Sequence, residues 1–347
     1  MYSPAASTHI EFASTNHSGL LAGLREQIDA RLAELLPPPE HAGDLMGAAL
    51  HEGVLAPGKR IRPLLMLLVG RSLGQSSAAL LDLACAVEMV HAASLFLDDM
   101  PCMDNARLRR GRPAVHARYG EDVAMLGAVA LVTQACAIAA SAPGLHGELR
   151  AQLVKVLCHA VGMQGLVRGQ YRDLREGASD RHCEDISSTN QQKTGSLFCA
   201  GFEMAALAAG ADEATRCALR TAALELGQAF QLRDDIQDNL KTPATLGKDR
   251  NKDAGKSTLV ALLGLEAAER RLAGHLDEAQ SQLRRALPDD EAMVSWVRSA
   301  FALSPQPRGQ VIEAGHEFHG GRLPRSLRSD TLAGPHYSTA PGPRPLG

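Results

Sequence analysis

The chain has 347 residues and a nearly balanced charge, with 36 Lys and Arg residues against 39 Asp and Glu residues. This balance gives no reason to expect nucleic-acid binding, so we expect no nucleic-acid partner. The seven cysteines include no Cys-x-x-Cys pair, which favours a reduced, cytoplasmic protein over a disulfide framework.

Apolar residues recur at three- and four-residue spacing, with hardly any alternating β-branched runs, so the sequence predicts an all-α fold. Helices are expected over Leu20–Leu36, Leu64–Leu73, Leu80–Asp99, Asp122–Ala140, Leu149–Gly169, Ser187–Ala209, Glu213–Asn239 and Thr258–Ala286. Loops are expected over residues 114–120 and over the highly charged residues 175–186.

Three segments follow from the same patterns. Residues 1–19 are expected to be a disordered N-terminus, and residues 20–300 a single folded domain. Residues 301–347 carry seven of the 18 prolines. Their composition, rich in Pro, Gly and Arg, predicts a largely disordered tail.

The longest apolar stretch runs from Val123 to Ala140 and is rich in alanine. It carries Thr133 and Gln134 near its centre. The sequence therefore predicts a buried helix there, and no stable insertion into a membrane.

Two aspartate clusters lie on otherwise apolar segments. They are Asp98, Asp99 and Asp104, and Asp234, Asp235 and Asp238. Concentrated negative charge is costly without a compensating cation, and Mg²⁺ prefers a few carboxylates together with phosphate oxygens. One such cluster alone is more often a solvated helix face, but two clusters with apolar flanks predict a magnesium site for a phosphate ester.

Basic residues supply the complementary charge. They occur in GKRIRP at 58–63, LRRGRP at 108–113, KTG at 193–195 and GKD at 247–249. Arginine binds phosphate through two parallel hydrogen bonds, and lysine acts as a compact point charge. A single basic patch is more often plain surface, but the combination with two carboxylate clusters favours a diphosphate pocket.

These segments resemble the trans-isoprenyl diphosphate synthases, in particular the bacterial geranylgeranyl diphosphate synthases of carotenoid pathways. The resemblance covers roughly residues 20–300. Its specific parts are GKRIRP at 58–63, MVHAASLFLDDMPCMDNARLRRGRP at 89–113, GMQGLVRGQYRDL at 162–174, KTGSLFCA at 193–200, GQAFQLRDDIQDN at 227–239 and LGKDRNKDAGKSTLV at 246–260.

The resemblance implies a bundle of about ten or more helices around a central diphosphate-binding cavity, and a homodimer. It implies head-to-tail condensation of isopentenyl diphosphate with an allylic diphosphate through an allylic carbocation. About three Mg²⁺ ions would be held between the two aspartate clusters. The product expected is geranylgeranyl diphosphate.

The resemblance also implies a role for individual residues. All six aspartates of the clusters are expected to be metal ligands, and all of them except Asp238 are grouped with Lys193 as catalytic. Isopentenyl diphosphate would be bound by Lys59, Arg62, His91 and Arg110. The allylic diphosphate would be bound by Arg109, Lys193, Thr194, Gln231, Lys248 and Lys256, and the metal-bound waters by Gln170 and Asp173.

Product length is expected to depend on the helix that carries the first cluster. At about 1.5 Å rise per residue, Ala93 and Ser94 lie roughly one turn below Asp98 and would line the tunnel for the growing tail. Their small side chains would leave the tunnel open to a C20 product. Met89 and Val90 are candidates for its floor.

Three alternatives stay open. A class I terpene cyclase normally lacks a second Asp-Asp-x-x-Asp motif, and Asp234–Asp238 therefore argues against that class. A non-catalytic regulatory subunit typically loses one cluster, whereas both are present here. A farnesyl diphosphate synthase differs only in product length.

Overall fold

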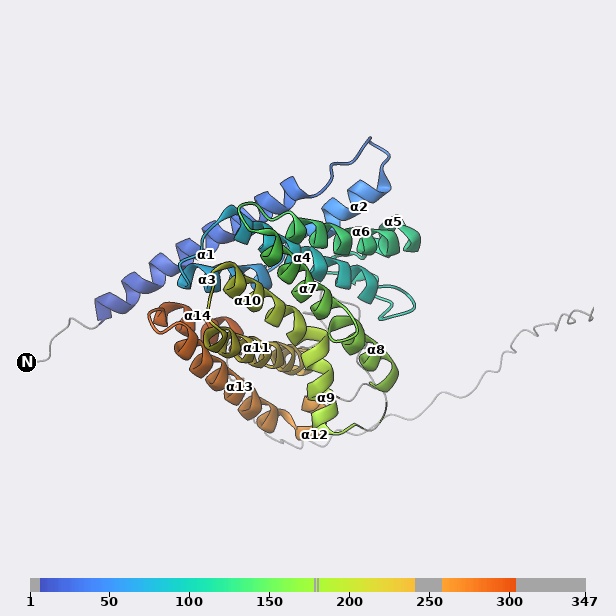
Figure 1. Cartoon of the computed structure of the whole chain (residues 1–347). Coiled ribbons are helices and arrows are strands. Elements are labelled where there is room, and N and C mark those ends of the chain that lie inside the picture. The colour runs from blue at the N-terminus through green and yellow to red at the C-terminus, as the bar shows by residue number, and fades with distance from the viewer. Residues whose placement is uncertain (1–6, 178, 180, 241–257, 304–347) are drawn as a thin grey trace, which may run out of the picture. The chain divides into compact units, whose positions relative to one another are not determined.

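Helices make up nearly all of the regular structure in the residues that the computed structural model describes, 7–177, 179, 181–240 and 258–303 (Figure 1). In chain order the elements are α1 (Ser7–Leu35), α2 (Leu45–Val54), α3 (Ile61–Ser72), α4 (Ala78–Asp98), β1 (Leu108–Arg109), β2 (Arg112–Pro113), α5 (Val115–Tyr119), α6 (Glu121–Ala140), α7 (Gly147–Val161), α8 (Leu166–Glu176), α9 (Cys183–Asn190), the π-helix η1 (Gln191–Gly195), α10 (Ser196–Ala208), α11 (Glu213–Leu240), α12 (Leu259–Leu263), α13 (Leu265–Ala286) and α14 (Glu291–Phe301). The prediction of an all-α fold is confirmed.

Helix α4 forms the centre of the core and packs against α3, α6 and α10. The hydroxyl of Ser77 caps its first turn by accepting a hydrogen bond from the backbone of Leu80. The helix ends at Asp98, because the following segment contains Pro101, which cannot continue a helix. Asp98 is therefore the last helical residue, and Asp104 belongs to the loop that follows.

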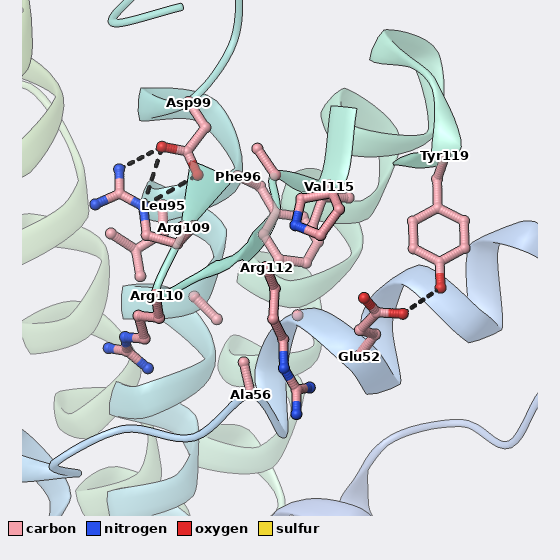
Figure 2. Close-up of a pocket in the computed structure, with 14 residues that line it drawn as sticks. Glu52, Ala56, Leu95, Phe96, Asp99, Arg109, Arg110, Arg112, Val115 and Tyr119 are labelled. Carbon is pink, nitrogen blue, oxygen red and sulfur yellow. Dashed lines mark hydrogen bonds and ion pairs between the residues drawn. The ribbon is translucent and has the colours of Figure 1, made fainter. Parts of the chain in front are cut away.

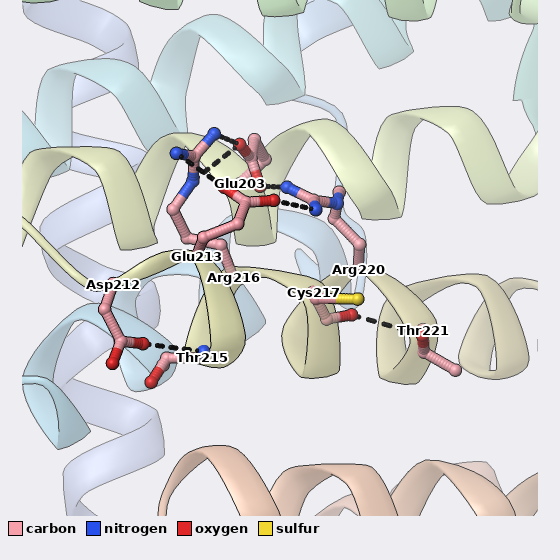
Figure 3. Close-up of polar contacts among 8 residues, drawn as sticks. All are labelled: Glu203, Asp212, Glu213, Thr215, Arg216, Cys217, Arg220 and Thr221. Atoms are coloured by element: carbon pink, nitrogen blue, oxygen red, sulfur yellow. Dashed lines mark hydrogen bonds and ion pairs between the residues drawn. The ribbon is translucent and has the colours of Figure 1, made fainter.

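Helix α11 carries the second aspartate cluster and packs against α10 and α13. A buried carboxylate, Glu203, joins α10 to the start of α11. It accepts hydrogen bonds from Arg216 (Nε, 2.9 Å) and from Arg220 (Nη1, 3.0 Å), and both arginines also pair with Glu213 (Figure 3). Because two cations compensate Glu203, the network fixes α11 against α10 without leaving a buried charge unpaired.

Glycines allow three elements to approach closely around η1. A Cβ atom on Gly169 of α8 would lie 2.2 Å from the backbone nitrogen of Lys193, and one on Gly227 of α11 would lie 2.5 Å from Cα of Gly195. No side chain fits at either position. The glycines of α8 and α11 thus let η1 pack directly against both helices, and a π-helical turn of this kind is frequent at functional sites.

Several predicted boundaries are wrong. The helix expected from Leu20 begins at Ser7, so part of the segment expected to be disordered, residues 1–19, is helical; no proline interrupts the chain between these two residues. The helix expected over Leu149–Gly169 is two helices, because a turn containing Gly162 and Gly165 separates α7 from α8. Similarly, Gly264 with φ +78° separates α12 from α13.

Other elements were not predicted. Helices α2 and α14 were missed, and the short α5 lies where a loop was expected, over residues 114–120. Short helices give too few turns for an apolar period to be recognised. The tail prediction for residues 301–347 concerns a segment that, after residue 303, lies outside the described residues.

Two helices of the described residues, α4 and α6, are long and apolar enough to span a membrane by length and composition. Most of the apolar window of α4 is buried in the core, but only 39% of that of α6 is. Met125, Leu126 and Val129 of α6 are exposed. The prediction that Val123–Ala140 is a buried helix is therefore correct for one face only, since hydropathy does not reveal which face has a neighbour.

Candidate active site

The two aspartate clusters face one cavity of about 260 Å³. Its lining comprises His91, Ser94, Leu95, Asp98, Asp104, Arg109, Leu166, Gln170, Asp173, Arg181, Ile186, Asn190, Lys193, Thr194, Gln231, Asp234, Asp235, Asp238 and Thr258. Among these described residues, six carboxylates face three cationic side chains. The cavity alone would therefore repel a diphosphate, and bound cations would be needed to reverse its charge.

The lining fits magnesium. Asp98 and Asp104 come from the first cluster, and Asp234, Asp235 and Asp238 from the second, so the charged donors are carboxylate oxygens, which suit this ion. Among the described residues, no three acidic, histidine or cysteine side chains are close enough to hold a metal by themselves. This agrees with the coordination chemistry of Mg²⁺, which usually completes its ligand shell with water and substrate phosphate oxygens.

Asp98 is a partly buried carboxylate at the end of α4. Burial raises its pKa to about 6, and the charge of Asp104 acts in the same direction, whereas Lys193 and Arg109 oppose the rise. A carboxylate that is costly to ionise while buried gains the most from a cation beside it.

A chain of polar contacts forms another part of the cavity wall. Lys193 Nζ donates to Asp173 Oδ2 at 2.7 Å. The hydroxyl of Thr194 donates to Gln231 Oε1 at 3.2 Å, and the amide of Gln231 donates to Asp235 Oδ1 at 2.9 Å. Through these contacts η1 is linked to the second aspartate cluster on α11.

Asp99 does not join the cavity with Asp98. Its carboxylate is buried and binds Arg109, whose Nε lies 3.1 Å from both oxygens and whose Nη2 makes a third contact (Figure 2). In this geometry Arg109 occupies the carboxylate of Asp99, and the role of Asp99 as a direct metal ligand stays a prediction. Consecutive residues on a helix point about 100° apart, so two adjacent aspartates can have different neighbours. Asp99 holds Arg109 at the cavity.

The hairpin of β1 and β2 directs Arg109 and Arg110 to different neighbours. Both residues of its turn, Arg110 (φ +54°) and Gly111 (φ +76°), have positive φ, as in a type I′ turn. Arg110 points away from Asp99 (Figure 2) and donates to the carbonyl of Pro57 at 3.0 Å. Arg109 thus contacts the first aspartate cluster, and the adjacent Arg110 contacts the loop before α3.

Two arginines, Arg62 and Arg110, place positive charge around the imidazole of His91, which lines the cavity. Arg62 Nη1 lies 3.5 Å from His91 Nε2, and the Arg62 guanidinium stacks on the ring of Phe198 at 4.7 Å. Burial lowers the pKa of Arg62 to about 10, with Arg110 adding to the effect. Burial, followed by the charges of these two arginines, holds the pKa of His91 well below its ordinary value. Such mutually repelling cations favour a bound anion.

The remaining predicted residues are placed as follows. Gln170 lines the cavity and its Oε1 is buried with no partner among the described residues, which suits a bound water. Ser94 also lines the cavity, whereas Ala93, Met89 and Val90 are packed in the core. Lys59 is exposed in the loop before α3. Lys248 and Lys256 lie outside the described residues.

Three polar residues of the cavity were missed in the sequence, Arg181, Asn190 and Thr258. Arg181 and Asn190 flank or belong to α9, which overlaps the charged segment expected to be a loop. The available signal was position, because Asn190 ends the helix that leads directly into the KTG motif.

An all-α bundle that turns two aspartate clusters and several cations toward one cavity is the architecture of an enzyme that acts on diphosphate esters with a divalent metal. The chain belongs to the polyprenyl synthetase family, whose sequence profile matches residues 44–297. It is thus a prenyltransferase that elongates prenyl chains.

Known relatives agree with this family. The chain is 51% identical over 298 residues to the geranylgeranyl diphosphate synthase of Pantoea ananas, covering 85% of this chain and 96% of that protein. It is 53% identical over 280 residues to the same enzyme of Pseudescherichia vulneris, covering 80% and 90%.

Solved structures show the same fold. An FPP/GFPP synthase from Zymomonas mobilis superposes with a TM-score of 0.75 at 32% identity, covering 83% of this chain and 99% of that one. A geranyltransferase from Helicobacter pylori, in complex with magnesium and isoprenyl diphosphate, gives a TM-score of 0.72 at 29% identity, covering 87% and 97%.

Proposed function

We propose that the protein condenses isopentenyl diphosphate with allylic diphosphates, head to tail, to give geranylgeranyl diphosphate. The observation that carries this proposal is the convergence of both aspartate clusters, Lys193 and Arg109 on one cavity. The names of the relatives from Pantoea ananas and Pseudescherichia vulneris support the C20 product.

The allylic diphosphate would lie between the two clusters. Asp98, Asp104, Asp234, Asp235 and Asp238 would hold about three Mg²⁺ ions, which neutralise charge on the diphosphate as it leaves. Gln170 and Asp173 would bind their water ligands.

Side chains of the cavity wall would also bind the leaving diphosphate directly. Lys193 and Arg109 place fixed positive charge where negative charge develops on the leaving diphosphate. Thr194 and Gln231 donate and accept hydrogen bonds beside it, and Gln231 keeps Asp235 in position. No side chain has to form a covalent bond, because the double bond of the second substrate is the nucleophile.

Isopentenyl diphosphate would bind beside the allylic substrate, at Arg62, His91, Arg110 and Lys59. Burial lowers the pKa of Arg62 and of Arg110, and neighbouring arginines add to the effect, so an anion there would relieve the repulsion. Because His91 is neutral near pH 7, it would contribute a hydrogen bond and not a charge.

The direct test is incubation of the purified protein with Mg²⁺, isopentenyl diphosphate and, separately, dimethylallyl, geranyl or farnesyl diphosphate, with products identified by mass. A chelator-sensitive C20 diphosphate is expected. A C15 product alone would assign a farnesyl diphosphate synthase. No elongation by folded protein would contradict the proposal and favour a non-catalytic subunit.

We also propose that the protein is a cytoplasmic homodimer paired through the exposed face of α6. Met125, Leu126 and Val129 are 47%, 59% and 60% exposed on this helix, and a second copy would cover them. All seven cysteines are free, which agrees with a reducing compartment.

Light scattering on wild type and Val129→Lys tests the dimer. The substitution should give a monomer, whereas Leu262→Lys, at an exposed apolar position of α12, should leave the dimer intact. A monomeric wild type, or one that binds lipid vesicles through α6, would contradict the pairing.

A further inference from the structure

Arg181 is a half-buried cation of the cavity wall that belongs to none of the recognised motifs. It lies just before α9. Its Nη2 donates to the backbone carbonyl of Asp185 at 3.1 Å and to the hydroxyl of Thr189. Both acceptors are uncharged, so no carboxylate of the described residues neutralises this guanidinium in an ion pair.

The other two cations of the cavity differ in this respect. Arg109 is paired with Asp99, and Lys193 with Asp173. Among the described residues that line the cavity, Arg181 is thus the cation that pairs with no carboxylate, so its charge can act on a bound ligand. An arginine fixed at a cavity without an ion-pair partner is suited to a phosphate group, which it can bind through two parallel hydrogen bonds.

The contacts of Arg181 also orient it. Thr189 donates its own hydroxyl proton to the carbonyl of Asp185 at 2.9 Å, so the two acceptors of Arg181 are tied to each other on α9. A side chain held in advance loses little conformational freedom when a ligand binds. The polar side chain of Asn190, the residue after Thr189, lines the same cavity.

Helix α9 continues directly into η1, which carries Lys193 and Thr194. Arg181, Asn190 and the phosphate-binding residues of η1 therefore come from one continuous stretch of wall. This wall stands with α11 and its aspartates around the same cavity.

We propose that Arg181 is a further binding residue for the allylic diphosphate, contacting its phosphate oxygens from the α9 wall with Asn190 beside it. The proposal rests on the placement of that substrate between the aspartate clusters. Arg181 stabilises the bound anion and breaks no bond itself.

The experiment compares Arg181→Met and Arg181→Lys with the control Arg172→Met. Arg172 lies on α8 and also ties α9 down, donating to Ser188 Oγ at 3.0 Å, but it does not line the cavity. KM is measured for farnesyl diphosphate and for isopentenyl diphosphate, and the affinity for inorganic diphosphate with Mg²⁺ by calorimetry.

Arg181→Met should raise KM for the allylic substrate about tenfold or more, while KM for isopentenyl diphosphate changes less than about twofold. Its affinity for inorganic diphosphate should fall in parallel. Arg181→Lys should recover part of both losses, because it keeps the charge. Arg172→Met should change neither KM by more than about twofold.

Equal effects on both substrates, or equal effects of Arg181→Met and Arg172→Met, would overturn the proposal and leave Arg181 a purely structural role. If Arg181→Met does not fold, Thr189→Val makes the same test, since it keeps the charge and removes one anchor. It should raise the allylic KM selectively, and no change would again overturn the proposal. Failure of the proposed function is a separate result, namely wild-type protein that binds or elongates no diphosphate.

Discussion

Asp99 and Arg109 form a part-buried ion pair, and Arg109 lines the cavity that Asp98 also lines. Because of this pair, the two adjacent aspartates differ in what they contact. Asp98 supplies an oxygen to the cavity, and Asp99 fixes the cation that lines it.

The first prediction separates these two roles. Asp99→Asn should raise KM for the allylic diphosphate about tenfold, because Arg109 loses its counter-charge, while the Mg²⁺ concentration for half-maximal activity stays nearly the same. Asp98→Asn should instead raise the Mg²⁺ requirement. Magnesium titrations of both variants test this. An equal rise of the Mg²⁺ concentration for half-maximal activity in the two variants would show that Asp99 is a metal ligand as well.

The second prediction concerns the close approach of α8 to η1. Gly169→Ala places a Cβ atom 2.2 Å from the backbone nitrogen of Lys193, so η1 has to move and kcat should fall about tenfold or more. Gly23→Ala on α1 meets no atom within 4 Å and should stabilise the protein by up to about 1 kcal/mol. Thermal unfolding and turnover of both variants test this, and full activity of Gly169→Ala would argue against the contact.

The third prediction identifies the side chain that faces the growing tail. Ser94 lines the cavity and Ala93 is packed in the core, so Ser94→Phe should shift the product from C20 toward C15. Ala93→Phe should overpack the core and cost about 1–3 kcal/mol of stability. Product masses and denaturant unfolding distinguish them. A shortened product from Ala93→Phe alone would place the tunnel on the other side of α4.

The fourth prediction is a pH dependence. Because the folded-state pKa of His91 is held well below its ordinary value of about 6.5, the unfolded chain takes up a proton near that pH that the folded chain does not. The contribution of His91 to stability is therefore present above that pH and is lost as the pH falls toward its folded pKa. His91→Gln removes this dependence.

Denaturant unfolding of wild type and His91→Gln at a series of pH values, without metal, gives the measurement. The stability difference between the two proteins should change in favour of the variant as the pH falls from about 7.5 to about 5.5. Contributions of other groups, including the raised pKa of Asp98, are shared and cancel in the comparison. A difference that is constant with pH would contradict the neutral state of His91.

The sequence predicted the all-α fold and most of the cavity, because the spacing of Asp234 and Asp238 fixes one helix face and the basic motifs lie close to acidic ones. It did not predict the pairing of Asp99 with Arg109, because this contact depends on how the hairpin of β1 and β2 folds back on α4. Arg181 was missed because its role depends on how α9 packs. The π-helical turn at Lys193 likewise depends on glycines in two distant helices, Gly169 and Gly227.

The central claim is that both aspartate clusters act together, through magnesium, on one diphosphate. Single-turnover condensation of farnesyl and isopentenyl diphosphate, followed across Mg²⁺ concentration in wild type, Asp98→Asn and Asp234→Asn, tests it most directly. Each variant should be slower by about 100-fold or more, and wild type should form no product with chelator present. A variant of either cluster that keeps the wild-type rate and magnesium dependence would contradict the account.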